Sequence, residues 1–140
     1  MQSDTSIIFA RCHEQHFAVS RVNPHTQACE DIVPPCIDRR YADFAPHPSD
    51  SSLILAVEEE HAPKDVYNRL VCLSESRVHT LHQGHSFYAY PRISPCGSFV
   101  AWVTWDHPSM PFWSSQLWVA SLLREPVPHI SEPVLVAGGH

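Results

Sequence analysis

Residues 53–57, which read LILAV, and residues 99–103, which read FVAWV, give the strongest indication of the fold of this chain. Each run is short and apolar, and each is followed by an acid and a histidine, at residues 60–61 and 106–107. Short apolar runs that end in polar residues predict buried β-strands. No window carries an apolar stripe of helical period with capping residues, so we expect little helix.

The two runs belong to a repeat that begins near Tyr41 and has a period of 47 residues (88 − 41). The repeated features are, in order, Tyr41 and Tyr88, Pro48 and Pro95, residues 70–73 and 117–120, and residues 78–81 and 134–136. The acids at 60 and 106 are 46 positions apart, which indicates one residue inserted in the first copy. Each copy is therefore expected to contain four short strands.

Four strands per unit and a period in the forties are typical of β-propeller blades. We therefore predict an all-β fold, an incomplete β-propeller with about two four-stranded antiparallel blades and part of a third. The expected units are a partial blade at residues 1–37 and blades at residues 38–84 and 85–140; an ordinary β-sandwich is the alternative. Because propellers close with about four to eight blades, the outer blade faces are expected to stay uncovered and apolar.

The composition excludes several classes of function. The 140 residues carry a formal net charge of −6, and no run of Lys or Arg is longer than two, so we expect no nucleic acid as a partner. No apolar run is long enough to span a membrane, and the N-terminus lacks the pattern of a signal peptide. Five scattered cysteines, an odd number, predict free thiols and favour a cytoplasmic protein.

Three motifs lie within or beside the second copy of the repeat. Residues 91–97 read PRISPCG, residues 105–111 read WDHPSMP, and residues 116–120 read QLWVA. They resemble the motifs P-R-x-S-P-D-G, W-D-H-P-N-M-P and E-L-W-V-A in the N-terminal propeller of prolyl-oligopeptidase-like serine peptidases, in the dipeptidyl-aminopeptidase and acylaminoacyl-peptidase branch. The resemblance covers roughly residues 38–139. Cys96 stands where the family usually has Asp, which hydrogen-bonds its own turn better than Cys.

The resemblance implies a non-catalytic propeller segment that restricts access to the peptidase site of the complete enzyme and selects short peptides. In that family the catalytic Ser, Asp and His lie in an α/β-hydrolase domain, with the Ser in a G-x-S-x-G turn. The four glycines here, at 84, 97, 138 and 139, bracket no serine, so we assign no catalytic residue and no cofactor to this chain. The implied partners are a peptide, the α/β-hydrolase domain of a longer enzyme, or another copy through the open blade faces.

Two other functions stay open. One is a stand-alone, diverged module for protein interaction, and the other, ranked last, is a metal-binding protein or an independent enzyme. The sequence does not distinguish a piece of a longer peptidase from a self-standing protein.

The loop that carries the WDHP motif supplies the candidate interface residues. By analogy with a whole enzyme, we expect this loop to contact the hydrolase domain or to line the entry path. The candidates are Trp105, Asp106, His107, Pro108, Met110 and Trp113. Trp105 and Trp113 flank the loop and are expected at the surface, whereas Trp102 and Trp118 lie on strands and are expected in the core.

Three other clusters carry reactive groups. They are Cys12, His13 and His16; His79, His82 and His85; and Glu58, Glu59 and Glu60. Thiolate and imidazole bind zinc, but the first cluster is expected to form a polar hairpin turn, so we predict no metal site. Histidines three apart on a strand face opposite sides, so the second cluster is expected to be solvated. The three acids are expected to leave a strand as a solvated charge cluster rather than to bind a cationic group.

Overall fold

The computed structural model of the chain describes residues 5–139, and within that range the chain forms strands and no helix. The strands are β1 (Ile7–His13), β2 (His16–Val22), β3 (Cys29–Cys36), β4 (Arg39–His47), β5 (Asp50–His61), β6 (Val66–Ser74), β7 (Arg77–His82), β8 (Phe87–Ile93), β9 (Phe99–Trp105), β10 (Gln116–Leu123), β11 (His129–Ile130) and β12 (Val134–Gly138). The expected all-β fold is confirmed.

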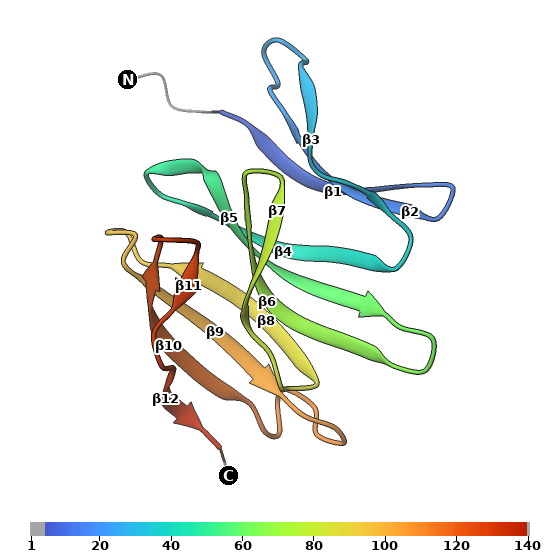
Figure 1. Cartoon of the computed structure of the whole chain (residues 1–140). Coiled ribbons are helices and arrows are strands. Elements are labelled where there is room, and N and C mark those ends of the chain that lie inside the picture. The colour runs from blue at the N-terminus through green and yellow to red at the C-terminus, as the bar shows by residue number, and fades with distance from the viewer. Residues whose placement is uncertain (1–4, 140) are drawn as a thin grey trace.

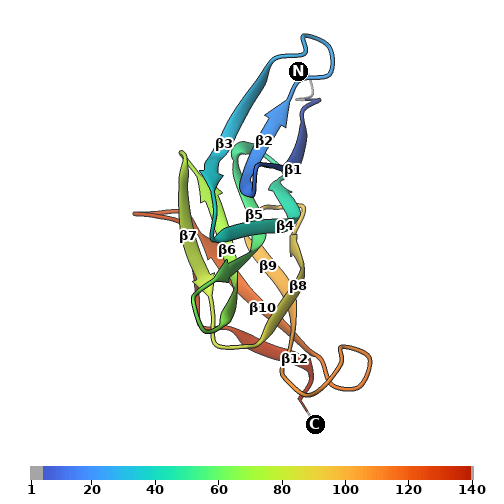
Figure 2. The same ribbon diagram turned by 90° about the vertical axis from the view of Figure 1, so that its right-hand side faces the viewer.

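The strands form three antiparallel sheets, each built from neighbours in the sequence (Figure 1). The first sheet has the order β1-β2-β3 and the second β4-β5-β6-β7; the third has the order β11-β10-β9-β8, and β12 also pairs with β10. The sheets stand in a row, and the two termini lie at opposite ends of it (Figure 2). The predicted unit boundaries at 37/38 and 84/85 fall in the links between sheets and stay predictions.

The second sheet lies in the middle of the row and is buried on both faces. Side chains alternate along β5, so that Leu53, Leu55 and Val57 face the third sheet while Ile54 and Ala56 face the first. All five are at most 9% exposed. Burial on both sides explains why this strand is continuously apolar instead of alternating.

The repeat seen in the sequence is also a repeat of backbone irregularities. The pairing of β4 with β5 shifts register between Ala42 and Ala45, and the pairing of β8 with β9 shifts 47 residues later, between Ala89 and Arg92. A bulge of this kind bends a strand and strengthens its twist. The second and third sheets are therefore bent in the same way at equivalent points, as copies of one unit would be.

Two strands differ from the expectation. β11 has no counterpart among the four strands predicted for its unit. β5 continues past Val57 to His61, because β4 and β6 pair with it over that length, so the acids at 58–60 lie in the strand and not in a loop. All five cysteines are free. Among residues 5–139 there is no helix with the length and hydropathy needed to cross a membrane.

Candidate functional site

The predicted interface loop joins β9 to β10, and its base is fixed to the link between the second and third sheets. Asp106 Oδ2 lies 2.8 Å from His85 Nδ1, and Asp106 Oδ1 accepts a hydrogen bond of 2.7 Å from the Ser86 backbone N–H. Partial burial acts to raise the pKa of Asp106, but the hydrogen bonds from His85 and Ser86 outweigh it and hold the pKa below its ordinary value. Asp106 is thus a carboxylate that joins the loop to the preceding link.

Aromatic packing reinforces this attachment. The Trp105 and Phe87 rings are stacked, with centroids 5.3 Å apart, and the His107 ring meets Phe87 edge-on at 4.8 Å. The His107 backbone N–H donates to Ser86 Oγ at 3.3 Å, and the peptide between His107 and Pro108 is cis. Trp105, expected at the surface, is therefore half-buried, and the first half of the loop has a defined position.

The tip of the loop is exposed and apolar. Met110 is 48% exposed and Trp113 76% exposed, and the Trp113 backbone N–H donates to the Met110 carbonyl oxygen at 2.9 Å. Phe112, which the sequence analysis did not include among the candidates, is 73% exposed and packs edge-on against Trp113 at 5.2 Å. The signal that could have found it is the run of large apolar side chains between prolines and serines. The structure thus separates the candidates into an anchored base and an aromatic tip.

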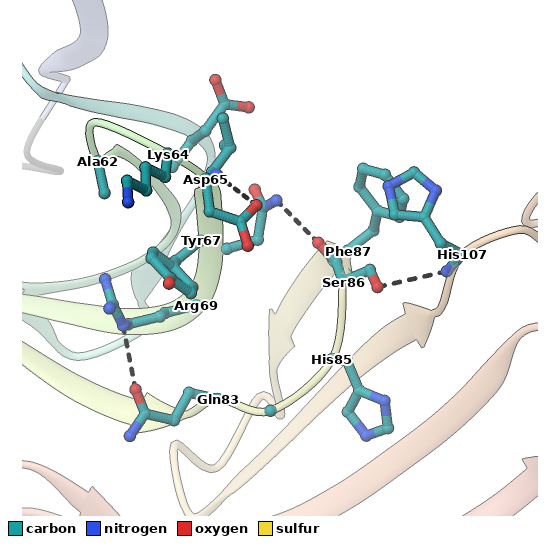
Figure 3. A pocket seen from close by; sticks show the side chains of 14 residues that line it. Ala62, Lys64, Asp65, Tyr67, Arg69, Gln83, His85, Ser86, Phe87 and His107 are labelled. Atoms are coloured by element: carbon teal, nitrogen blue, oxygen red, sulfur yellow. Dashed lines mark hydrogen bonds between the residues drawn. The ribbon is translucent and has the colours of Figure 1, made fainter.

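A groove of about 1080 Å³ lies beside the base of the loop. Tyr67 and Arg69 of β6 stand on one side, and Ser86, Phe87 and His107 stand on the other (Figure 3). The Arg69 guanidinium lies over the Tyr67 ring, 5.8 Å from its centroid. This lining of charged and aromatic side chains suits a polar ligand with an apolar part better than a purely apolar one.

Glu58 and Glu60 of β5 form an ionic cluster with Arg69, so the solvated cluster expected from the sequence is wrong for the buried Glu58, whereas the Glu59 side chain is 41% exposed. Glu58 is only 2% exposed, and it accepts hydrogen bonds from Tyr41 Oη at 2.8 Å and from Arg69 Nη1 at 3.1 Å. Arg69 Nη1 also donates to Glu60 at 2.6 Å. Burial and the neighbouring Glu58 carboxylate raise the pKa of Tyr41 well above its ordinary value, so its hydroxyl remains a donor. The charged and polar groups of this cluster therefore find their hydrogen-bond partners in one another.

The histidines at 82 and 85 also differ from the expectation, because they converge. Their rings are stacked with centroids 5.9 Å apart, and His82 Nδ1 lies 2.9 Å from Tyr88 Oη. The rule of opposite faces fails because β7 ends at His82 and the chain then turns toward β8. Burial, followed in size by the charge of His85, lowers the pKa of His82. His79 remains on β7, apart from this pair.

Cys12, His13 and His16 lie in the β1–β2 hairpin as expected. His13 pairs with His16 across a two-residue turn in which Glu14 and Gln15 have φ values of 48° and 65°. In residues 5–139 no cluster of three or more His, Cys, Asp or Glu side chains is arranged to hold a metal ion.

Two groupings contain part of a serine-hydrolase triad, and each is incomplete. His85 lies against Asp106, but Ser86 Oγ accepts a backbone N–H at 3.3 Å and is not paired with that imidazole in the described contacts. Ser49 Oγ lies 3.4 Å from His47 Nδ1, but the other ring nitrogen of His47 lies 3.2 Å from a backbone carbonyl oxygen and not a carboxylate. Among residues 5–139, neither grouping connects nucleophile to base and base to acid in the order that a triad requires.

Known proteins were compared with the chain by sequence and by structure. No family model and no curated protein matches it. A puromycin-hydrolyzing peptidase from Mycobacterium tuberculosis superposes with a TM-score of 0.81 and 25% identity over 99% of the chain. The chain resembles the propeller of prolyl-oligopeptidase-like peptidases. It covers 23% of that peptidase, so it spans less than a quarter of its length.

Two other solved structures share the fold. A puromycin hydrolase superposes with a TM-score of 0.76 and 22% identity, over 99% of the chain and 23% of its own length. TolB from Acinetobacter baumannii superposes with a TM-score of 0.53 and 15% identity, over 92% of the chain and 30% of its own length. The predicted architecture, an incomplete propeller, is confirmed by the superposition on the puromycin-hydrolyzing peptidase, which covers 99% of this chain.

Proposed function

We propose that the chain is a non-catalytic propeller segment that acts beside a serine-peptidase domain, where it restricts access to the active site and selects short peptides. The observation that supports this most is the superposition of 99% of the chain on a puromycin-hydrolyzing peptidase at a TM-score of 0.81. The partner of the segment is the α/β-hydrolase domain, and its ligand is a peptide or an aminoacyl compound such as puromycin. The cytoplasm is the compartment that we propose, because all five cysteines are free.

The exposed loop tip is the part of the surface best suited to this role. Phe112 and Trp113 present two aromatic rings whose position is set by the anchored base of the same loop. Aromatic side chains contribute large contact areas with few rotatable bonds, which favours their use at interfaces. An aromatic substrate side chain or an apolar patch of the hydrolase domain would cover this tip.

The proposal is tested in the native protein that carries this segment. An antibody against the chain should detect a product several times larger than 15.8 kDa, and that product should hydrolyse puromycin or an aminoacyl p-nitroanilide. Replacing both Phe112 and Trp113 with alanine should raise KM about 10-fold or more with a smaller change in kcat, because the tip binds and does no chemistry. Val127→Ala, at another exposed apolar position, is the control. An inactive product, or an unchanged KM, would contradict the proposal.

A second candidate is a stand-alone module for protein interaction. It is favoured by the apolar face that the third sheet turns away from the second, since large apolar patches on soluble proteins mark interaction sites. A native product of 15.8 kDa without peptidase activity would favour this candidate over the first.

A further inference from the structure

The third sheet has one covered face and one open face. Val100 and Trp102 on β9 and Ala120 and Leu122 on β10 pack against the second sheet. The side chains that alternate with them form the open face, which we define as Phe99, Ala101, Val103, Leu117 and Val119, extended over β12 by Val134 and Val136. None of the seven is charged, and the outermost are well exposed, with Val134 at 62% and Phe99 at 49%. At the β8 edge of the same face lies Arg92, which pairs with Ala101 and has a side chain that is 63% exposed.

The repeat shows what such a face looks like when it is covered. The positions of the second sheet that correspond to Phe99, Ala101, Val103, Leu117 and Val119 are Leu53, Leu55, Val57, Leu70 and Cys72. These five side chains are between 0% and 9% exposed, because the third sheet packs on them. The equivalent positions on the open face are also apolar, so they suit the same kind of cover, another β-sheet that presents apolar side chains.

The correspondence extends to the edge strands. The pairing of β6 with β7 shifts register between Leu70 and Val71, which leaves Leu81 as the extra residue. The pairing of β10 with β12 shifts at the equivalent point, between Leu117 and Trp118, which leaves Val136 as the extra residue. Leu81 is 9% exposed and belongs to the core, whereas Val136 is 56% exposed. The two faces therefore match in backbone shape, and over β9, β10 and β12 they match in polarity as well. They differ at the β8 edge, where Arg92 takes the place of the buried Ala45.

The face at the other end of the row is different in character. Along β2, Val19 packs toward the second sheet, so Ser20 faces away from it. Ser20 Oγ donates to Asp31 Oδ1 at 2.7 Å, and Arg11 donates to both, at 2.9 Å to Ser20 Oγ and 2.8 Å to Asp31 Oδ2. This outer face of the first sheet is a satisfied polar network, which does not complement an apolar sheet face.

We propose that the 140-residue chain by itself pairs with a second copy through the open face of its third sheet. The matching apolar surface that the chain itself offers is the same face of another copy, so the contact is isologous and closes at two copies. The two sheets would pack face to face as in a β-sandwich. This inference is independent of the proposed function, since it concerns the isolated chain when nothing else covers the face.

The area of the open face indicates how strongly the dimer should associate. Three strands about 4.8 Å apart, with about seven residues of about 3.3 Å each, span on the order of 330 Å² before side-chain relief is counted. A standard interface buries about 800 Å² per partner, so this contact belongs to the small, reversible class. The dimer is therefore expected to dissociate on dilution.

The experiment is size-exclusion chromatography with multi-angle light scattering on the 140-residue chain, at about 100 µM and about 1 µM, which bracket a micromolar affinity. The wild type should be a dimer at the higher concentration and mostly a monomer at the lower. Phe99→Lys and Val134→Lys should each weaken the dimer about 10-fold or more, because each places an unpaired charge in the contact. Both positions are half-exposed in the monomer, and near-UV circular dichroism checks that the variants keep the fold.

Two control variants test whether the contact is specific to this face. Trp113→Ser removes the most exposed aromatic side chain, and Ile7→Lys changes the first sheet, where Ile7 is 54% exposed. Both should leave the dimer intact. A wild type that is monomeric at the higher concentration, dimers that survive both substitutions on the open face, or a dimer lost in either control would overturn the proposal. Oligomers that lengthen with concentration would also overturn it, because they require a head-to-tail contact.

Discussion

The second and third sheets repeat one pattern, yet they differ at an equivalent pair of buried polar positions. In the second sheet Glu58 accepts from Arg69 at 3.1 Å, and in the third the same positions are Thr104 and Gln116, which are hydrogen-bonded at 3.4 Å. Glu58 is 2% exposed and Thr104 is 0% exposed. The position of Glu58 and Thr104 therefore carries a hydrogen-bonded polar group in both sheets, but that group is charged only in the second sheet.

The surroundings of the two pairs explain the difference. The charged pair has Tyr41 as a further donor and Glu60 as a second acceptor beside Arg69. The neutral pair instead has Trp118, whose Nε1–H donates to Thr104 Oγ1 at 2.9 Å. Each copy satisfies its buried polar atoms with the partners that its own neighbours supply, so the pairs cannot be exchanged one residue at a time.

The largest effect is expected at the contact between the two sheets. Trp102→Ala should lower the free energy of unfolding by about 4 kcal/mol, because it removes a side chain that is 0% exposed and leaves a cavity. Trp102→Phe should cost much less, since Trp102 Nε1 is buried without a hydrogen-bond partner among the described residues. Urea denaturation followed by near-UV circular dichroism measures both. Equal losses in the two variants would show that the indole N–H has a partner or that the site does not tolerate repacking.

Replacing the buried Glu58 of the second sheet should have the next largest effect on the free energy of unfolding. Glu58→Ala should lower the free energy of unfolding by about 3 kcal/mol, because Arg69 and the Tyr41 hydroxyl lose a buried acceptor. The double variant with Glu58→Thr and Arg69→Gln copies the third sheet and should recover part of this loss. Urea denaturation of the single and double variants gives the comparison. A double variant no more stable than Glu58→Ala would show that the neutral pair works only with Trp118 beside it.

A third prediction concerns the turn between β8 and β9. Gly97 has a φ of +77°, and a Cβ there would lie 2.5 Å from His47 Nε2, so Gly97→Ala both strains the backbone and displaces a buried ring. A loss of about 2 kcal/mol is expected from the left-handed conformation and the clash together. Gly84→Ala is the control, because its φ is +115° but no atom lies within 4 Å of the added Cβ. A smaller loss of stability in Gly84→Ala than in Gly97→Ala would show the cost of the contact with His47. Equal losses in the two variants would contradict a cost from that contact.

The smallest expected effect is a pH dependence of the free energy of unfolding that comes from the second sheet and has no counterpart in the third. His82 lies at the end of β7, where the third sheet has Ala137. Because burial lowers the pKa of His82 below its ordinary 6.5, the unfolded chain binds a proton there more readily than the folded chain as the pH falls below that value. The free energy of unfolding should therefore decrease below pH 6.5 and be unaffected by this group above it. Urea midpoints at several pH values should show a weaker decrease in His82→Gln than in the wild type, and identical slopes would contradict this origin.

The repeat, most of the strands and the resemblance to a peptidase propeller could be predicted from the amino-acid sequence. Apolar runs such as residues 53–57 and the turn at Gly97 are local signals, because burial on both faces and a left-handed φ each restrict the residue types at one position. The hairpin at His13 and His16, the absence of a G-x-S-x-G turn and the core position of Trp102 follow from the same kind of local information.

Environments that depend on several sheets at once could be found only in the folded chain. Glu58 is buried because β4 and β6 extend β5 beyond its apolar run and bring Tyr41 and Arg69 to the carboxylate. His82 and His85 meet because the chain turns after β7, which the spacing of residues along a strand cannot show. The first sheet has a polar outer face, and the third sheet has an apolar open face. This difference also depends on the whole row of sheets. The same alternation of side chains gives a core face where a neighbouring sheet covers the strand, and an exposed surface where no sheet covers it.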